Sequence, residues 1–175
     1  MGISLYGYSN VTTKNVPKDL RATIRKNATP PMRHLLDYLL WEGNTKIIVS
    51  KESEEWLKEI SSDDKFIAID WRNHVYFERT PETVEAEFHS SYSGFDALNR
   101  FVESKMPSSS LTFRVPDTDI EPWDGIIRGR DLSDALGDFS YAKLHSSPSE
   151  LEEMSLDAVI KVYDVADTNG VLLIR

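Results

Sequence analysis

The sequence predicts an α+β fold: a mainly antiparallel sheet with helices packed on one face, in a single domain over residues 1–175. Two observations predict it. Segments rich in β-branched and aromatic residues are too numerous for an all-helical fold, and they do not alternate regularly with helical segments as the strands of a parallel sheet do. A chain of 175 residues with 40% hydrophobic residues can also bury a core without disulfides or metals.

Five elements are expected in the first third of the chain. Pro17 favours a helix start, because proline is tolerated in the first helical turn. Met and Leu recur at helical spacing after Pro31 and predict a second helix, which Gly43 can end. Ser50 can cap a third helix through its side-chain oxygen. The expected elements are a strand at 3–8, helices at 17–26 and 32–42, a strand at 47–49 and a helix at 52–60.

The middle of the chain predicts a hairpin followed by mixed elements. Residues 65–80 contain two runs of β-branched and aromatic residues on either side of Arg72-Asn73, which favours two paired strands. A helix-start signature at 80–82 then competes with the alternation of apolar residues at 84–88. We favour a strand there, because it continues the meander. Beyond it we expect a helix at 94–105, a strand at 110–115 and an irregular segment at 116–131.

The last third of the chain predicts a closing hairpin. Asn169-Gly170 lies between two apolar runs, and both residues accept a positive φ, which makes this pair the strongest short hairpin signal in the sequence. The sequence therefore predicts strands at 157–165 and 171–175 joined by that turn. The elements expected before the hairpin are one helical turn at 131–136, a strand at 140–145 and a short helix at 149–154.

Composition excludes several kinds of site. The chain has no cysteine, which excludes disulfides, thiolate metal sites and a cysteine nucleophile, and fits a reducing compartment. The first ten residues lack the basic and apolar regions of a signal peptide, and no apolar run is long enough to span a membrane. We therefore expect a cytoplasmic protein with no membrane association.

The acidic residues are concentrated after the first 50 positions. Residues 1–50 hold seven Lys or Arg and three Asp or Glu, a surplus of four positive charges; residues 51–175 hold 13 and 26, a surplus of 13 negative charges. Such a surface repels nucleic acid and anionic lipid, and attracts basic proteins. The charge therefore disfavours direct nucleic-acid binding and favours a basic protein partner.

The triplet His-Ser-Ser occurs twice, each time after an apolar residue, at 89–91 and 145–147. The two triplets resemble the paired His-x-Ser/Thr units of two-histidine phosphoesterases. That resemblance implies one histidine as general base, the other as general acid, and the hydroxyl two residues later on the phosphate. The implied catalytic residues are His89, Ser91, His145 and Ser147.

A structural interpretation of the triplets fits the flanking residues better. Ser147-Pro148-Ser149-Glu150 spells a capping box, with proline at the first helical position. Ser93-Gly94-Phe95-Asp96 repeats this pattern, with Asp96 in the role of the glutamate. We therefore expect the triplets to mark strand-to-helix corners and favour a protein with no catalytic residues.

The segment after Val115 is the most acidic short stretch that also carries a tryptophan. Its alternating carboxylates look like the start of a calcium loop, but Pro122 stands where the loop needs glycine and Arg128 where it needs glutamate. An acidic segment that carries a tryptophan is better suited to gripping a basic partner. The predicted partner-binding residues are Asp117, Asp119, Glu121, Trp123 and Asp124.

A second candidate surface is basic. Lys18, Arg21 and Arg25 share one face of the helix expected at 17–26 and could bind an anion, although a solvated face is the favoured interpretation. The four histidines never occur at the spacings of local metal ligands, and no glycine-rich phosphate loop is present. We expect neither a metal nor a cofactor.

These observations predict a small acidic binding protein, of the inhibitor or immunity type. It would block a basic partner that handles nucleic acid or nucleotides by presenting carboxylates where phosphates would lie. Two alternatives stay open. One is a small phosphoesterase or nucleotide hydrolase that uses His89 and His145, and the other is a virion or assembly subunit.

Overall fold

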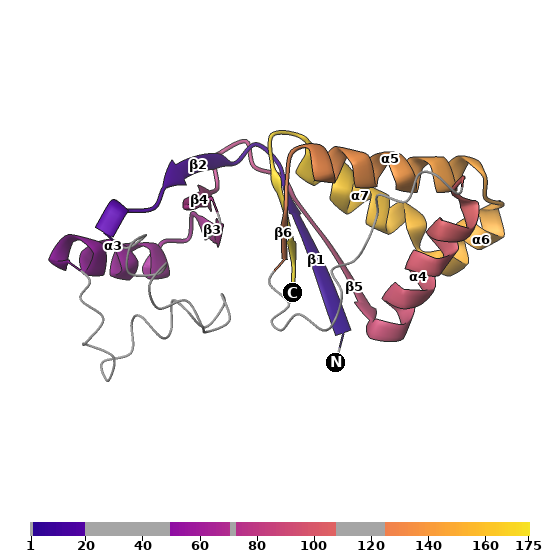
Figure 1. Ribbon diagram of the computed structural model, residues 1–175, viewed down its shortest axis with the longest axis horizontal. Coiled ribbons are helices and arrows are strands. Elements are labelled where there is room, and N and C mark those ends of the chain that lie inside the picture. The colour runs from indigo at the N-terminus through magenta and orange to yellow at the C-terminus, as the bar shows by residue number, and fades with distance from the viewer. Residues whose placement is uncertain (1, 20–49, 71–72, 108–124) are drawn as a thin grey trace. The chain divides into compact units, whose positions relative to one another are not determined.

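The computed structural model describes residues 2–19, 50–70, 73–107 and 125–175, which form two compact units. Unit 1 comprises residues 1–10 and 82–175, and unit 2 comprises residues 11–81. Both units pair antiparallel strands with helices, so the α+β class is confirmed (Figure 1). The prediction of a single domain stays a prediction. None of the helices in the described ranges is both long and apolar enough to cross a membrane.

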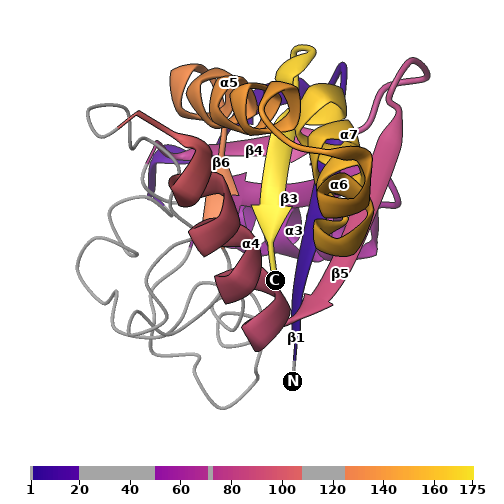
Figure 2. The ribbon, with the colours of Figure 1, turned by 90° about the vertical axis from the view of Figure 1, so that its right-hand side faces the viewer.

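Unit 1 is a four-stranded antiparallel sheet with helices on one face (Figures 1 and 2). In sheet order its strands are β5 (Glu85–Ser91), β1 (Gly2–Tyr8), β7 (Val171–Ile174) and β6 (Gly125–Ile127). The helices, called here the helical layer, are α4 (Tyr92–Lys105), α5 (Arg130–Leu144), α6 (Pro148–Met154) and α7 (Leu156–Asp167).

The core of unit 1 lies between the sheet and the helical layer. Ile3 and Leu5 of β1 alternate toward the helices and are almost fully buried. Helix α7 presents its apolar residues at helical spacing and is buried along that stripe. The Phe139 ring of α5 meets the Tyr163 ring of α7 edge to face at 4.9 Å. Burial raises the pKa of the Tyr163 hydroxyl above its ordinary value, so it stays neutral.

Gly7 allows α7 to lie directly on β1. A Cβ at this position would overlap the carbonyl oxygen of Val162, which belongs to the α7 backbone and cannot turn aside as a side chain could. Gly170, just before β7, is restricted in the same way by the carbonyl oxygens of Tyr8 and Ala166. Glycine at these two positions therefore sets how closely helix and sheet approach.

Unit 2 is a three-stranded antiparallel sheet with one described helix. Its strands are, in sheet order, β2 (Thr12–Asn15), β4 (Val75–Glu78) and β3 (Phe66–Asp70), and the helix is α3 (Lys51–Ser62). The Asp19 carboxylate accepts hydrogen bonds from the hydroxyls of Ser50 and Ser53 at the start of α3. Ser50 also caps the helix by accepting from the Ser53 N–H, as predicted.

Unit 2 is inserted between two neighbouring strands of unit 1. The chain leaves after β1 and returns into β5, and hydrogen bonds join the two crossing points. The Ser9 N–H donates to the Val84 carbonyl at 2.9 Å, and the Val84 N–H donates to the Ser9 hydroxyl at 3.0 Å. The Asn10 N–H donates to the Thr168 carbonyl at 2.9 Å. These hydrogen bonds hold the two ends of the insertion together within unit 1.

Most predicted elements of the described ranges are confirmed. They are the strand at 3–8, the helix at 52–60, the paired strands within 65–80, the strand favoured over a helix for the alternation at 84–88, and the helices at 94–105 and 149–154. The elements predicted at 32–42, 47–49 and 110–115, and most of the helix at 17–26, lie outside the described residues.

Several predictions in the last third of the chain are wrong. The residues of the predicted turn at 131–136 are helical, but the helix continues through the predicted strand at 140–145 as α5. The predicted strand at 157–165 is helix α7, so the predicted hairpin with 171–175 is wrong as well. The segment predicted to be irregular at 116–131 contains β6. Packing of the stripe of α7 against the sheet outweighs the strand propensity of its valines. Asn169 does have a positive φ, but its turn joins a helix to a strand.

Replacing Gly7 by alanine should destabilise the protein by about 1–3 kcal/mol, because the new methyl group would push α7 off the sheet. Gly137 is the matched control: it lies in α5, and a Cβ there meets no atom within 4 Å. Gly137→Ala should stabilise by about 0.5–1 kcal/mol. Urea unfolding measures both, and equal effects would contradict the close approach at Gly7.

Candidate functional site

The predicted partner-binding and anion-binding residues are only partly described. The partner-binding residues Asp117, Asp119, Glu121, Trp123 and Asp124 all lie outside the described residues. Of the basic residues, Lys18 is described and exposed, whereas Arg21 and Arg25 are outside. Both surfaces therefore stay predictions.

His89 belongs to a polar cluster on the open face of the unit 1 sheet. It lies opposite Ser4 in the β1–β5 ladder, and its Nδ1 is 2.7 Å from the Ser4 hydroxyl. Its Nε2 lies 3.6 Å from the Glu87 carboxylate, and its ring meets the Tyr6 ring edge-on at 5.7 Å. The His89 side chain is 54% exposed, so water solvates this polar cluster.

His145 lies in the helical layer, at the end of α5. Its backbone N–H donates to the carbonyls of Tyr141 and Ala142, and its ring is tilted against the Tyr141 ring at 4.3 Å. Phe88 packs on Phe95 of α4, so alternation turns the neighbouring His89 to the opposite face of the sheet. The structure does not bring the two histidines together.

Ser91 and Ser147 are helix caps. Ser91 accepts a hydrogen bond from the Gly94 N–H at 3.1 Å and caps α4, which begins two residues earlier than predicted. The prediction that Ser93 caps this helix, with Asp96 as its partner, is wrong, because Asp96 instead pairs with Arg100 at 2.8 Å. The first triplet thus marks a strand-to-helix corner.

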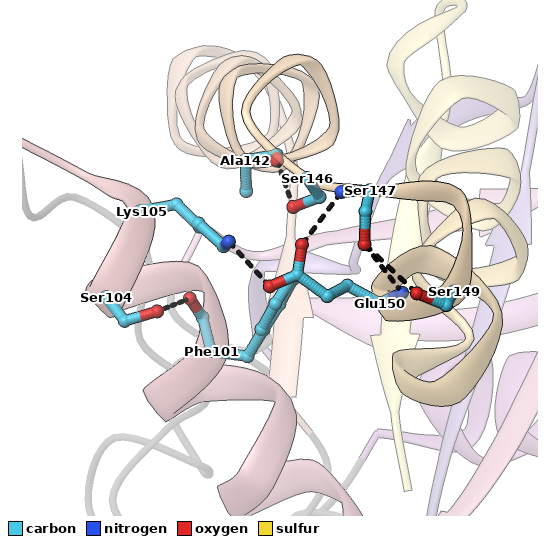
Figure 3. A network of polar contacts seen from close by, with 8 residues as sticks. All are labelled: Phe101, Ser104, Lys105, Ala142, Ser146, Ser147, Ser149 and Glu150. Carbon is cyan, nitrogen blue, oxygen red and sulfur yellow. Dashed lines mark hydrogen bonds and ion pairs between the residues drawn. The ribbon is translucent and has the colours of Figure 1, made fainter.

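The second triplet forms a corner between two helices, α5 and α6, rather than between a strand and a helix (Figure 3). The predicted capping box is present: the Glu150 N–H donates to the Ser147 hydroxyl at 3.4 Å, and the Ser147 N–H donates to the Glu150 carboxylate at 2.7 Å. The other oxygen of that carboxylate forms an ion pair with the Nζ of Lys105 in α4 at 2.8 Å. Glu150 therefore closes the cap of its own helix, α6, and ties that helix to α4.

These contacts lower the pKa of Glu150 from its ordinary 4.5 to about 2. The hydrogen bond from Lys105 is the largest cause, followed by those from the backbone and the side chain of Ser147. Lys105 itself lies 5.2 Å from the centre of the Phe101 ring. The charged groups of this corner, Lys105 and Glu150, pair with each other, so the network serves the structure of the corner.

The negative charge of the chain is concentrated in unit 1. Unit 1 holds 18 acidic and eight basic residues, a net charge of −10, whereas unit 2 holds 11 and 12, a net charge of +1. The helical layer carries 11 acidic and five basic residues, a surplus of six. Charge is therefore distributed by unit as well as along the sequence.

Ion pairs within the helical layer use most of its basic residues. Arg100, Lys105, Arg130 and Lys143 each contact an acid of this layer. Six further acids of the layer are exposed and form no ion pair with any residue that the structure describes. They are Glu103, Asp131, Glu152, Glu153, Asp164 and Asp167. These six, called here the uncompensated acids, are the candidate functional residues of the described chain.

The sequence did not single out the uncompensated acids, although they are all visible in it. The sequence predicts Asp164 in a strand and Asp131 in an isolated helical turn, so neither is predicted on the outward face of a long helix. A helical period over 156–167 places Asp157, Lys161 and Asp164 on one side, opposite the apolar stripe, and was the available signal.

In the ranges that are described, His, Asp and Glu side chains nowhere gather in groups of three that could hold a metal ion. Comparisons with known protein families, with curated proteins and with solved structures find no match to this chain.

Ser147→Ala should lower the free energy of unfolding by ~1 kcal/mol, because the Glu150 N–H loses its capping oxygen. Ser149→Ala removes a neighbouring hydroxyl whose side-chain hydrogen bond within the described chain is to Ser147, and it should change stability by less than about 0.5 kcal/mol. Denaturant unfolding compares them, and equal effects of the two substitutions would contradict the cap.

The ion pair of Glu150 should make stability depend on pH. Because its folded pKa is lowered, its contribution is fully present above pH 4.5 and is lost as the pH falls toward about 2. The stability difference between the wild type and Glu150→Gln should therefore shrink over that range.

The matched control is the same pair of proteins in a Lys105→Gln background. Removing the lysine removes the largest cause of the lowered pKa, so the pH dependence of the Glu150→Gln effect should be smaller. Urea unfolding at several pH values measures this, and an identical pH dependence in both backgrounds would refute the role of Lys105.

Proposed function

We propose that this chain is an acidic binding protein that blocks a basic partner, one that handles nucleic acid or nucleotides, in the manner of an inhibitor or immunity protein. The observation that carries the proposal is the surplus of six negative charges on the helical layer, with six exposed acids outside every described ion pair. A surface of this kind presents carboxylates where a basic site would otherwise hold phosphates.

The restriction of this charge to unit 1 supports the proposal. With a net charge of −10 on unit 1 and +1 on unit 2, the field of the molecule draws a basic partner toward unit 1. Exposed charges are screened beyond ~8 Å at physiological salt, so steering of this kind acts mainly on the association rate and weakens as salt rises.

The partner can be isolated by capturing proteins on the immobilised chain from cell extract, at low and at high salt, and then measured as a purified protein. Neutralising four uncompensated acids (Glu103→Gln, Glu152→Gln, Glu153→Gln and Asp164→Asn) removes four charges with little change in size. We expect this variant to associate with a basic partner at least about tenfold more slowly at low salt, with a smaller change in dissociation.

The matched control neutralises the predicted acids Asp117, Asp119, Glu121 and Asp124, which removes the same number of charges elsewhere. A smaller effect of this control assigns the contact to the helical layer, and a larger effect assigns it to residues 117–124. Capture that is indifferent to both variants and to salt would refute the proposal, as would a captured partner with no basic surface.

A further inference from the structure

Strand β5 is an edge of the unit 1 sheet. It pairs with β1 on one side, and in the described chain no strand pairs with its other side. In Figure 2, β5 forms one margin of this sheet, with β1 beside it. The strand is seven residues long, which is long for an unprotected edge.

The hydrogen bonds of β1 determine which groups of β5 point outward. Ser4 and Arg175 exchange both of their backbone hydrogen bonds, so the Ser4 backbone faces β7. The backbone N–H and C=O groups of Ile3, Leu5 and Gly7 therefore point toward β5 and bond to its even-numbered residues. The bond from Ser9 to Val84, which continues this register, confirms the phase. The backbone groups of the odd-numbered residues of β5 consequently point away from the sheet.

Glu87 and His89 are the central outward residues. Their backbone N–H and C=O groups form no hydrogen bond with any residue that the structure describes. The two side chains are exposed on the open face, where the His89 ring contacts Ser4, Tyr6 and Glu87. Two donors and two acceptors are thus spaced as another strand requires.

The side chains of β5 indicate what such a strand would carry. On the open face the outward residues include the acids Glu85 and Glu87, both exposed. On the helix face Ala86 and Phe88 are only partly buried and would be covered further by an apolar neighbour. An added strand places residues directly beside these positions, alternating between the two faces. The matching pattern is basic and apolar in alternation.

We propose that β5 binds an extended segment of a basic partner by adding it to the sheet as a fifth strand, with Lys or Arg beside Glu85 and Glu87 and apolar residues beside Phe88. This inference rests on the proposed function for the basic character of the partner, and adds a binding mode and a sequence pattern. A second copy of β5 is a poorer fit, because like charges on neighbouring strands repel.

The test uses the full chain and two blocked synthetic peptides as long as β5, seven residues. One peptide alternates lysine and valine, starting with lysine; the other has the same composition with all its lysines at one end. The alternating peptide should slow amide exchange of Glu87 and His89 at least about tenfold, whereas the other should not, although their charges are equal.

A proline at an outward position blocks the edge without touching the ladder to β1. Glu87→Pro removes one outward N–H and should abolish binding of the alternating peptide. Glu87→Gln is the matched control: it loses the same charge, keeps the N–H, and should retain protection of the His89 amide on peptide binding. Slow amide exchange at Ala86 and Phe88 shows that a variant keeps strand β5. If the proline variant loses this strand, the comparison of the two peptides on the wild-type chain is the deciding test.

Equal protection by both peptides, or binding that leaves the Glu87 and His89 amides unprotected, would overturn the inference. If the Glu87 and His89 amides become more protected as the protein concentration rises without any peptide, a second copy of the chain occupies the edge and the inference is overturned. These failures are separate from failure of the proposed function. A partner that is lost when the uncompensated acids are neutralised, while the β5 amides stay exposed, would leave that function standing.

Discussion

The close approach of α7 to β1 is the constraint on which unit 1 depends. Gly7 and Gly170 leave room for the helix backbone, so the apolar stripe of α7 lies flat on the sheet. With α7 fixed there, α5 packs beside it through Phe139 and Tyr163, and the other helices complete one covered face. Most charged residues of these helices are consequently directed outward, whereas Asp138 of α5 is buried.

The same arrangement separates three kinds of surface within unit 1. The helical layer is acidic on its outside, and its few basic residues are mostly held in ion pairs such as Lys105 with Glu150. The open face of the sheet carries the polar cluster around His89. The outer margin of β5 offers backbone groups. The two proposals use the first and the third surface, and both favour a basic partner.

The sequence predicted local features well, because short-range rules govern them. Ser50 and Ser147 cap their helices as expected, and the alternation at 84–88 predicts a strand because Ala86 and Phe88 share the partly buried face of β5. It failed at α7, where valines favour a strand locally but packing on β1 beside Gly7 favours a helix, and at α5, which packs on α7 through Phe139 and Tyr163.

The candidate site could be predicted in kind but not in place. The surplus of acidic residues is a property of composition, so an acidic surface followed from the sequence. Which acids stay uncompensated depends on helix phase and on ion pairs such as Lys143 with Asp157, and these required the fold. The pairing of Ser4 with His89, 85 residues apart, is likewise set by strand register, which no local pattern specifies.

The most direct test of the central claim, that unit 1 holds a basic partner through its helical layer, is carboxylate footprinting of the complex. Exposed acids are coupled to a small amine with and without the partner, and their modification is quantified by mass spectrometry. The account predicts that Glu103, Glu152, Glu153 and Asp164 lose reactivity on binding, while Glu52, Glu55 and Glu59 of α3, which are also exposed, keep theirs. Protection confined to the acids of α3, with the helical layer still fully reactive, would contradict it.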